Sequence, residues 1–206
     1  MKKLSLSFIL AFIFLITLSG NTRVSAYSIN SSINEPQTDS VTLQVDGNNA
    51  YYQKVVRVDS NITESMIYGR ALQFTASKNF QQNYGYEEEG KLIFTTTQDL
   101  NINTVYVGDD SDLLEPYTVQ FALTLDLKNG SYRYTIHNVL FYIPEGNGNK
   151  RETLYDVYTK ATNTESKRVA KNAKKLLESF ERYITTLTGE LYDGIEQKSL
   201  IYKSKF

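Results

Sequence analysis

The sequence predicts an α+β domain in which helices cover an antiparallel sheet. Residues 116–144 form two runs of alternating apolar and polar residues joined by Asn129-Gly130, a pair that strongly favours a hairpin turn. Two other segments, beginning near Thr63 and Glu165, repeat apolar residues every three or four positions, as amphipathic helices do. Each element buries one face, so the helices are expected to pack on the sheet.

The first 26 residues have the features of a secretory signal peptide. Lys2 and Lys3 precede an apolar run from Phe8 to Leu18, and small residues end at Ala26, where cleavage is expected. The protein is therefore expected to be exported, to the periplasm or the extracellular space. A retained membrane anchor is the alternative, but the run is shorter than the ~20 residues of a spanning helix. No stable membrane insertion is expected after cleavage.

Composition limits the chemistry and the partners. The chain has one His and no Cys, so it can form no disulfide. Without residues 1–26, it keeps 19 basic and 23 acidic residues, a net charge of −4. Nucleic acid is not an expected partner of an exported acidic chain.

The polar composition of residues 27–50 predicts a tether, although Val41–Val45 alternates and favours a short edge strand. A single domain is predicted over residues 51–192, starting with a strand at Tyr51–Val58. Thr63 can cap a helix that ends before Gly85, and Lys91–Thr97 alternates as a second strand. The apolar line of this helix consists of Ile67, Ala71 and Phe74, and Phe80 does not fall on it. Either the helix stops short of Phe80, or the chain turns to bring this residue back.

A two-residue turn fixes the register of the hairpin, which pairs Lys128 with Ser131 and, further along, Val119 with Leu140. The same register would bury the amide of Asn138 opposite Phe121, and a buried amide needs hydrogen-bond partners. Two solutions remain open. Asn138 bonds to neighbouring backbone, or a β-bulge turns it outward and bends the sheet, and the bulge is slightly favoured.

Residues 145–164 are predicted to be a loop, followed by a closing helix over residues 165–192 and an exposed or loosely docked tail over 193–206. The basic residues of the helix lie largely off its apolar stripe. Packing of the apolar stripe on the sheet is favoured over a membrane-surface or coiled-coil role. The basic residues are Lys167, Arg168, Lys171, Lys174 and Lys175.

No residue pattern predicts catalysis, a cofactor or a metal site. His137 has no clustered carboxylates nearby, and consecutive Glu87–Glu89 point in different directions, which favours a solvated acidic turn. Asp109–Asp112 lacks the ligand spacing of a calcium loop. The candidate site is instead a binding surface on the sheet face opposite the helices. Its predicted residues are Ala122, Thr124, Thr135, His137, Val139 and Phe141.

Three segments carry a resemblance to a known family: VVRVDSNITESMIYGRALQFTASKNF, GKLIFTTT and YTVQFALTLDLKNGSYRYTIHNV. Together they resemble a domain of unknown function from Bacteroidota envelope proteins that has a TATA-box-binding-protein-like (TBP-like) fold. The likeness covers roughly Tyr51–Val139, and the turn at Lys128–Ile136 is its most specific part. It implies a curved antiparallel sheet with two helices packed on one face, in the order β-α-β-β-β-α. It implies no activity.

These observations favour an exported, non-catalytic binding or scaffold module of the bacterial cell envelope, which meets an unknown envelope protein through the open sheet face. The tether or the 145–164 loop covering that face is an equally favoured arrangement. The alternative function is a carrier that holds a small apolar ligand between the long helix and the sheet. Its motivation is a set of tyrosines with polar tips, Tyr117, Tyr132, Tyr134 and Tyr142.

Overall fold

The computed structural model describes residues 41–105, 112–145 and 148–197. The predicted signal peptide and residues 27–40 of the predicted tether lie outside these ranges, as does most of Asp109–Asp112. The elements in chain order are β1 (Leu43–Asp46), β2 (Asn49–Arg57), α1 (Glu64–Ser77), β3 (Gln81–Tyr86), a short 3-10 helix η1 (Glu87–Glu89), β4 (Lys91–Val105), β5 (Asp112–Lys128), β6 (Ser131–Glu145), β7 (Gly148–Thr153), α2 (Leu154–Asn163) and α3 (Lys167–Glu196).

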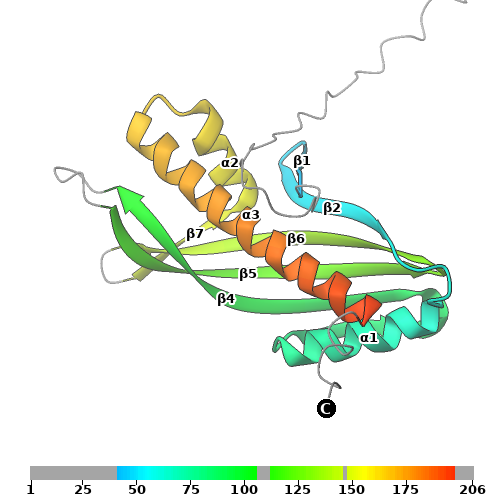
Figure 1. Cartoon of the computed structure of the whole chain (residues 1–206). Helices are drawn as coiled ribbons and strands as arrows, with labels where there is room; N and C mark the ends of the chain where they lie inside the picture. The colour runs from blue at the N-terminus through cyan, green and yellow to red at the C-terminus, as the bar shows by residue number, and fades with distance from the viewer. Residues whose placement is uncertain (1–40, 106–111, 146–147, 198–206) are drawn as a thin grey trace, which may run out of the picture.

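The strands form one antiparallel sheet in the order β1-β2-β6-β5-β4-β3, and β7 pairs with the far end of β6. Three helices, rather than the predicted two, lie on one side of this sheet (Figure 1). Their apolar residues and those of the strands form a single buried core. The α+β prediction, with helices packed on one face of an antiparallel sheet, is therefore confirmed.

The central hairpin of β5 and β6 has the predicted register near its turn. Lys128 pairs with Ser131, and the pairing continues unbroken to Ala122 and His137. The register then shifts by one residue at Asn138, which is exposed and has a positive φ of 53°. The favoured β-bulge is thus confirmed. Asn suits this position because it tolerates a positive φ better than most residues.

Helix α1 begins as predicted but ends earlier. The Thr63 hydroxyl accepts a hydrogen bond from the Met66 amide at 3.3 Å, which caps the first turn. After Ser77 the chain reverses through Asn79, whose φ is 58°, and this reversal returns Phe80 to the core. The residues after Phe80 form strand β3, where the sequence had predicted the end of the helix.

The prediction of a loop over residues 145–164 is wrong for most of this range, because these residues form β7 and α2. Thr153 and Asp156 form a reciprocal capping box at the start of α2. The hydrogen bonds from Thr153 lower the pKa of the Asp156 carboxyl. Helix α2 packs on β2, β6 and α3, on the covered side of the sheet. Its residues therefore do not cover the open face.

Strand and helix residues extend beyond both ends of the domain predicted over residues 51–192. Residues 43–46 and 49–50, assigned to the tether, belong to a hairpin whose Leu43 is buried, so the edge-strand interpretation was the better one. At the other end, α3 continues past Tyr192 to Glu196, and Ile195 is fully buried. Residues 193–196 therefore belong to the helix and not to a tail.

Helix α3 contributes the aromatic centre of the core. The Phe180 ring meets the edges or faces of Tyr52, Phe121 and Phe141, with ring centroids 6.0, 5.8 and 5.3 Å away. These three rings come from β2, β5 and β6. One side chain of α3 thus joins the helix to the three central strands.

A partly buried carboxylate lies at the edge of this aromatic cluster. The Tyr52 hydroxyl donates a hydrogen bond to Glu181 at 3.4 Å. Burial is the largest influence on Glu181 and, with repulsion from Glu178, it outweighs this hydrogen bond and raises the pKa of the carboxyl from 4.5 to about 7. Below a pH of about 7, the Glu181 carboxyl of the folded protein is therefore mainly in its neutral form.

We expect the unfolding free energy to decrease as the pH rises from 4.5 through about 7. The folded state retains a proton on Glu181 that the unfolded chain has already lost, so stability is greatest below this range. Glu181→Gln should remove about 1 kcal/mol of the pH dependence, a value that allows for solvent screening. Urea unfolding at several pH values measures it. Glu178→Gln, an exposed neighbour, should keep most of the dependence, and equal curves for Glu181→Gln and the unmodified protein would contradict the assignment.

Candidate functional site

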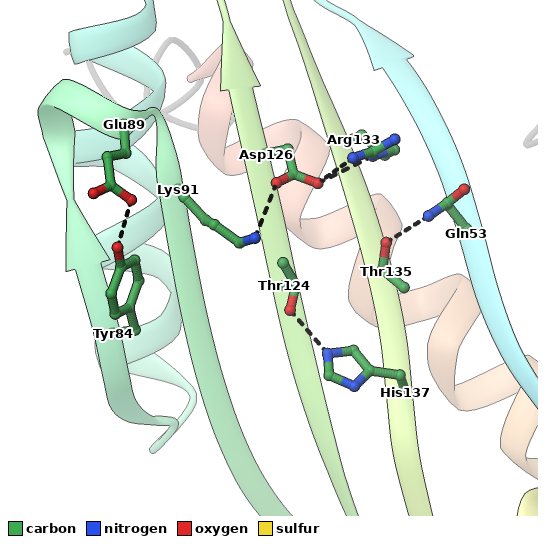
Figure 2. Close-up of polar contacts among 9 residues, drawn as sticks. All are labelled: Gln53, Tyr84, Glu89, Lys91, Thr124, Asp126, Arg133, Thr135 and His137. Atoms are coloured by element: carbon green, nitrogen blue, oxygen red, sulfur yellow. Dashed lines mark hydrogen bonds and ion pairs between the residues drawn. The ribbon is translucent and has the colours of Figure 1, made fainter. Parts of the chain in front are cut away.

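The sheet face opposite the helices carries mainly hydroxyl and amide side chains, and no helix of the described residues covers it. Figure 2 shows part of this face with the helices behind the strands. We call it the open face. Its residues, assigned from the strand pairing, include Gln53 on β2, Tyr84 and Tyr86 on β3, Lys91, Ile93, Thr95, Thr97 and Asp99 on β4, Thr118, Gln120, Ala122, Thr124 and Asp126 on β5, and Arg133, Thr135, His137, Leu140 and Tyr142 on β6.

Four of the six predicted site residues lie together at the centre of the open face. Thr124 and His137 share a hydrogen bond of 2.9 Å across the hairpin. Thr135, directly opposite Thr124, accepts a hydrogen bond of 2.9 Å from the Gln53 amide. Ala122 lies between Thr95 and His137 on the neighbouring strands. The centre of the face is therefore an ordered polar layer in which Ala122 and Thr124 are buried, whereas Thr135 and His137 are partly exposed.

The other two predicted site residues, Val139 and Phe141, do not belong to the open face. Both are buried on the helix side, where Phe141 contacts Phe180. The bulge at Asn138 adds one residue to β6, so every later side chain changes face relative to an unbroken register. Leu140 and Tyr142 occupy the open face in their place.

A group of ion pairs lies at the turn end of the open face. The Asp126 carboxylate accepts hydrogen bonds from Arg133 at 2.7 and 3.0 Å, and Lys91 approaches it at 3.9 Å (Figure 2). The three side chains come from β4, β5 and β6. These partly exposed contacts align the three strands and contribute little stability.

Tyrosines stand at two borders of the face, and sequence reasoning missed them. On the edge strand β3, the rings of Tyr84 and Tyr86 lie 5.1 Å apart. At the other border, Tyr142 donates a hydrogen bond of 3.0 Å to Gln120, and the Arg151 guanidinium of β7 lies 5.5 Å from its ring. Tyr84 and Tyr86 could not be placed beforehand, because β3 was not predicted as a strand. Tyr142 was expected between the long helix and the sheet, and the register shift in β6 turns it to the open face.

Glu89 and His137, two of the side chains considered for metal binding or proton transfer, form hydrogen bonds within the domain. The described residues contain no group of three or more His, Asp or Glu side chains placed to hold a metal ion. Glu87–Glu89 form η1, where Glu89 accepts the hydroxyl of Tyr84. His137 has Thr124 as its hydrogen-bond partner rather than an acid that would prepare it for proton transfer. No helix among the described residues has the length and apolar character of a membrane span.

The tyrosines that motivated the carrier hypothesis do not form one lining. Tyr117, Tyr132 and Tyr134 are buried core residues, whereas Tyr142 lies on the open face. The Tyr134 hydroxyl is hydrogen-bonded with Thr188 of α3. The Tyr132 hydroxyl is buried without a hydrogen-bond partner among the described residues, and this burial raises the pKa of the phenol. The space between α3 and the sheet is occupied by packed rings.

Comparison with known proteins identifies the family of this fold. Residues 52–142 match the family model described as a domain of unknown function (DUF4468) with TBP-like fold. A search of curated proteins found no match.

Two solved structures are similar to this chain. One is a TBP-like protein from Parabacteroides distasonis, with a TM-score of 0.60 and 11% identity over 74% of this chain and 96% of that one. The other is a DUF4468 family protein from Bacteroides ovatus, with a TM-score of 0.56 and 11% identity over 73% of this chain and 90% of that one. At this identity the likeness concerns the fold. The sheet and the helices on one face agree with these structures. The chain therefore has a TBP-like fold, and its residues 52–142 are similar to the DUF4468 family.

Proposed function

We propose that the protein is an exported, non-catalytic binding module of the bacterial cell envelope and that its open face receives another envelope protein. The observation that supports this most is the ordered row of uncharged polar side chains at the centre of a sheet face that no described helix covers. A non-obligate protein interface is about as apolar as the rest of a protein surface, with few charges at its centre and with tyrosine enriched.

The composition of the open face narrows the kind of partner. Its central side chains are Thr, Gln, Ala and His137, and its charges at the turn end, Asp126, Arg133 and Lys91, are already paired. A strongly charged ligand would find no excess of opposite charge there. The face suits an uncharged polar surface on a folded partner, with Tyr84, Tyr86 and Tyr142 able to pack against it.

Export is part of the proposal because the features of residues 1–26 support it. The carrier alternative has weaker support, since its tyrosines divide between the core and the open face.

Site-specific photo-cross-linking in the native host tests the use of the open face. A photoreactive residue at Thr97, which is exposed and pairs with Gln120, should cross-link one envelope protein. The same probe at Gln73, exposed on α1, is the matched control and should not capture that protein. Adding Gln120→Arg to the Thr97 probe should remove the cross-link, whereas Gln73→Arg should leave it. The same product from both positions, or none from Thr97, would contradict the proposal.

A further inference from the structure

The first part of α3 carries a stripe of basic side chains opposite its buried face, of which Lys175 is partly exposed and the others are exposed. At 100° per residue, positions 167, 168, 171, 174 and 175 fall within an arc of roughly 120°. The buried residues Ala173, Leu176, Leu177 and Phe180 lie on the other side of the helix. We call Lys167, Arg168, Lys171, Lys174 and Lys175 the basic stripe.

Helix stability does not account for the basic stripe. The first turn of α3 contains no acidic residue, so the stripe places positive charges at the positive end of the helix dipole. Lys167 and Lys171, like Lys171 and Lys175, are four positions apart and repel each other. A solvent-exposed helix face chosen for stability would carry the opposite charges in this turn.

The acidic end of α3 differs, because it has partners inside the domain. Glu190 forms an ion pair of 2.7 Å with Lys78, and Glu196 accepts a hydrogen bond of 3.0 Å from the Asp59 amide. Among the described residues, Lys167, Arg168, Lys171 and Lys174 have no ion pair. The acidic end is thus explained by contacts within the fold, whereas the charges of these four basic residues are not.

The local charge is large compared with that of the chain. Residues 150–175 hold eight Lys or Arg and three Asp or Glu, a net charge of +5, although the whole chain carries −1. One of the three acids, Glu152, is buried between Lys150 and Lys160 and already paired. The α2 and α3 end of the domain is therefore strongly positive.

We propose that the basic stripe binds the surface of an anionic phospholipid membrane. Four of its five charges are lysines, which act as point charges rather than as the planar forks that recognise one phosphate in a fixed geometry. No large apolar side chain lies within the stripe, so the contact is electrostatic and peripheral.

Vesicle flotation of the full chain tests this surface. Binding is measured to vesicles of phosphatidylcholine with phosphatidylglycerol and to vesicles of phosphatidylcholine alone. The difference between the two is the excess binding, and taking this difference cancels any contribution of the apolar leader. The triple variant Lys167→Gln, Lys171→Gln and Lys174→Gln should lose this excess by roughly 100-fold. The charge-matched control Arg57→Gln, Lys128→Gln and Arg133→Gln, all exposed positions on the sheet, should keep it.

Other results would overturn the proposal. Equal losses in the two triple variants would show a non-specific charge effect, and an excess that added salt does not reduce would exclude electrostatic binding. Binding of a soluble polyanion such as heparin with no excess on anionic vesicles would favour an anionic polymer instead. Concentration-dependent dimers that the stripe variant loses, again with no vesicle excess, would assign the stripe to a second copy of the chain.

Urea unfolding of both variants verifies that they fold. The stripe variant is expected to be at least as stable as the unmodified protein, because the lysine charges that it lacks oppose the helix dipole.

Discussion

Replacing Phe180 with Ala is expected to lower the unfolding free energy by about 4 kcal/mol. The ring is fully buried and meets aromatic rings from three strands, with its nearest centroid, that of Phe141, 5.3 Å away. Its removal leaves a cavity where α3 joins β2, β5 and β6, and those rigid strands can close little of it. Urea unfolding followed by circular dichroism measures the loss.

Arg182→Ala is the control for this substitution, because Arg182 is exposed two positions further along the same helix. Its change in unfolding free energy should stay within about 0.5 kcal/mol. If Phe180→Ala instead costs no more than Arg182→Ala, α3 does not hold the central strands together through this ring.

The parts of the fold that were predictable from sequence depend on local signals. Asn129-Gly130 fixes the hairpin register over the first pairs, because a two-residue turn leaves little freedom. The apolar stripe of α3 repeats over many turns, so its existence and its buried side follow from periodicity alone. Thr63 capped α1 as expected, and only the end of that helix was misplaced.

The missed elements lack such signals or carry weak ones. Strand β3 reads QQNYGY, and none of its first three residues is buried, so no alternation of apolar residues marks this edge strand. Strand β7 is also polar, with Glu152 as its buried residue, and that carboxylate is paired with Lys150 of the same strand and Lys160 of α2. The capping box at Thr153 and Asp156 was the available local signal for α2.

The candidate site was predictable only on one side of the bulge. Ala122, Thr124, Thr135 and His137 precede the register shift and lie where the turn places them. Sequence alone could favour a bulge at Asn138. It could not assign the faces of the residues after Asn138, because that assignment depends on how many residues the bulge adds. Periodicity also cannot show which polar face is left uncovered, since that depends on where α2 packs.

The bulge leads to a second large effect: Phe141→Asp is expected to lower the unfolding free energy by more than about 4 kcal/mol, enough to prevent folding of a marginally stable domain. The side chain is fully buried between the sheet and Phe180, so the substitution removes apolar packing and buries an unpaired charge. Leu140→Asp, one residue earlier, should cost about 1 kcal/mol because Leu140 is partly exposed on the open face.

The comparison of these neighbours tests the register itself, since an unbroken hairpin would pair Leu140 with Val119 in the core and turn Phe141 outward. The observed partners are Val119 with Phe141 and Gln120 with Leu140. Thermal and urea unfolding of both variants, with soluble expression as a first readout, therefore report which side chain is inside. A larger loss for Leu140→Asp would contradict the bulge and return Phe141 to the open face. With the bulge in place, a loss of partner binding in Phe141→Asp would reflect unfolding, so tests of the open face must use exposed positions such as Thr97 and Gln120.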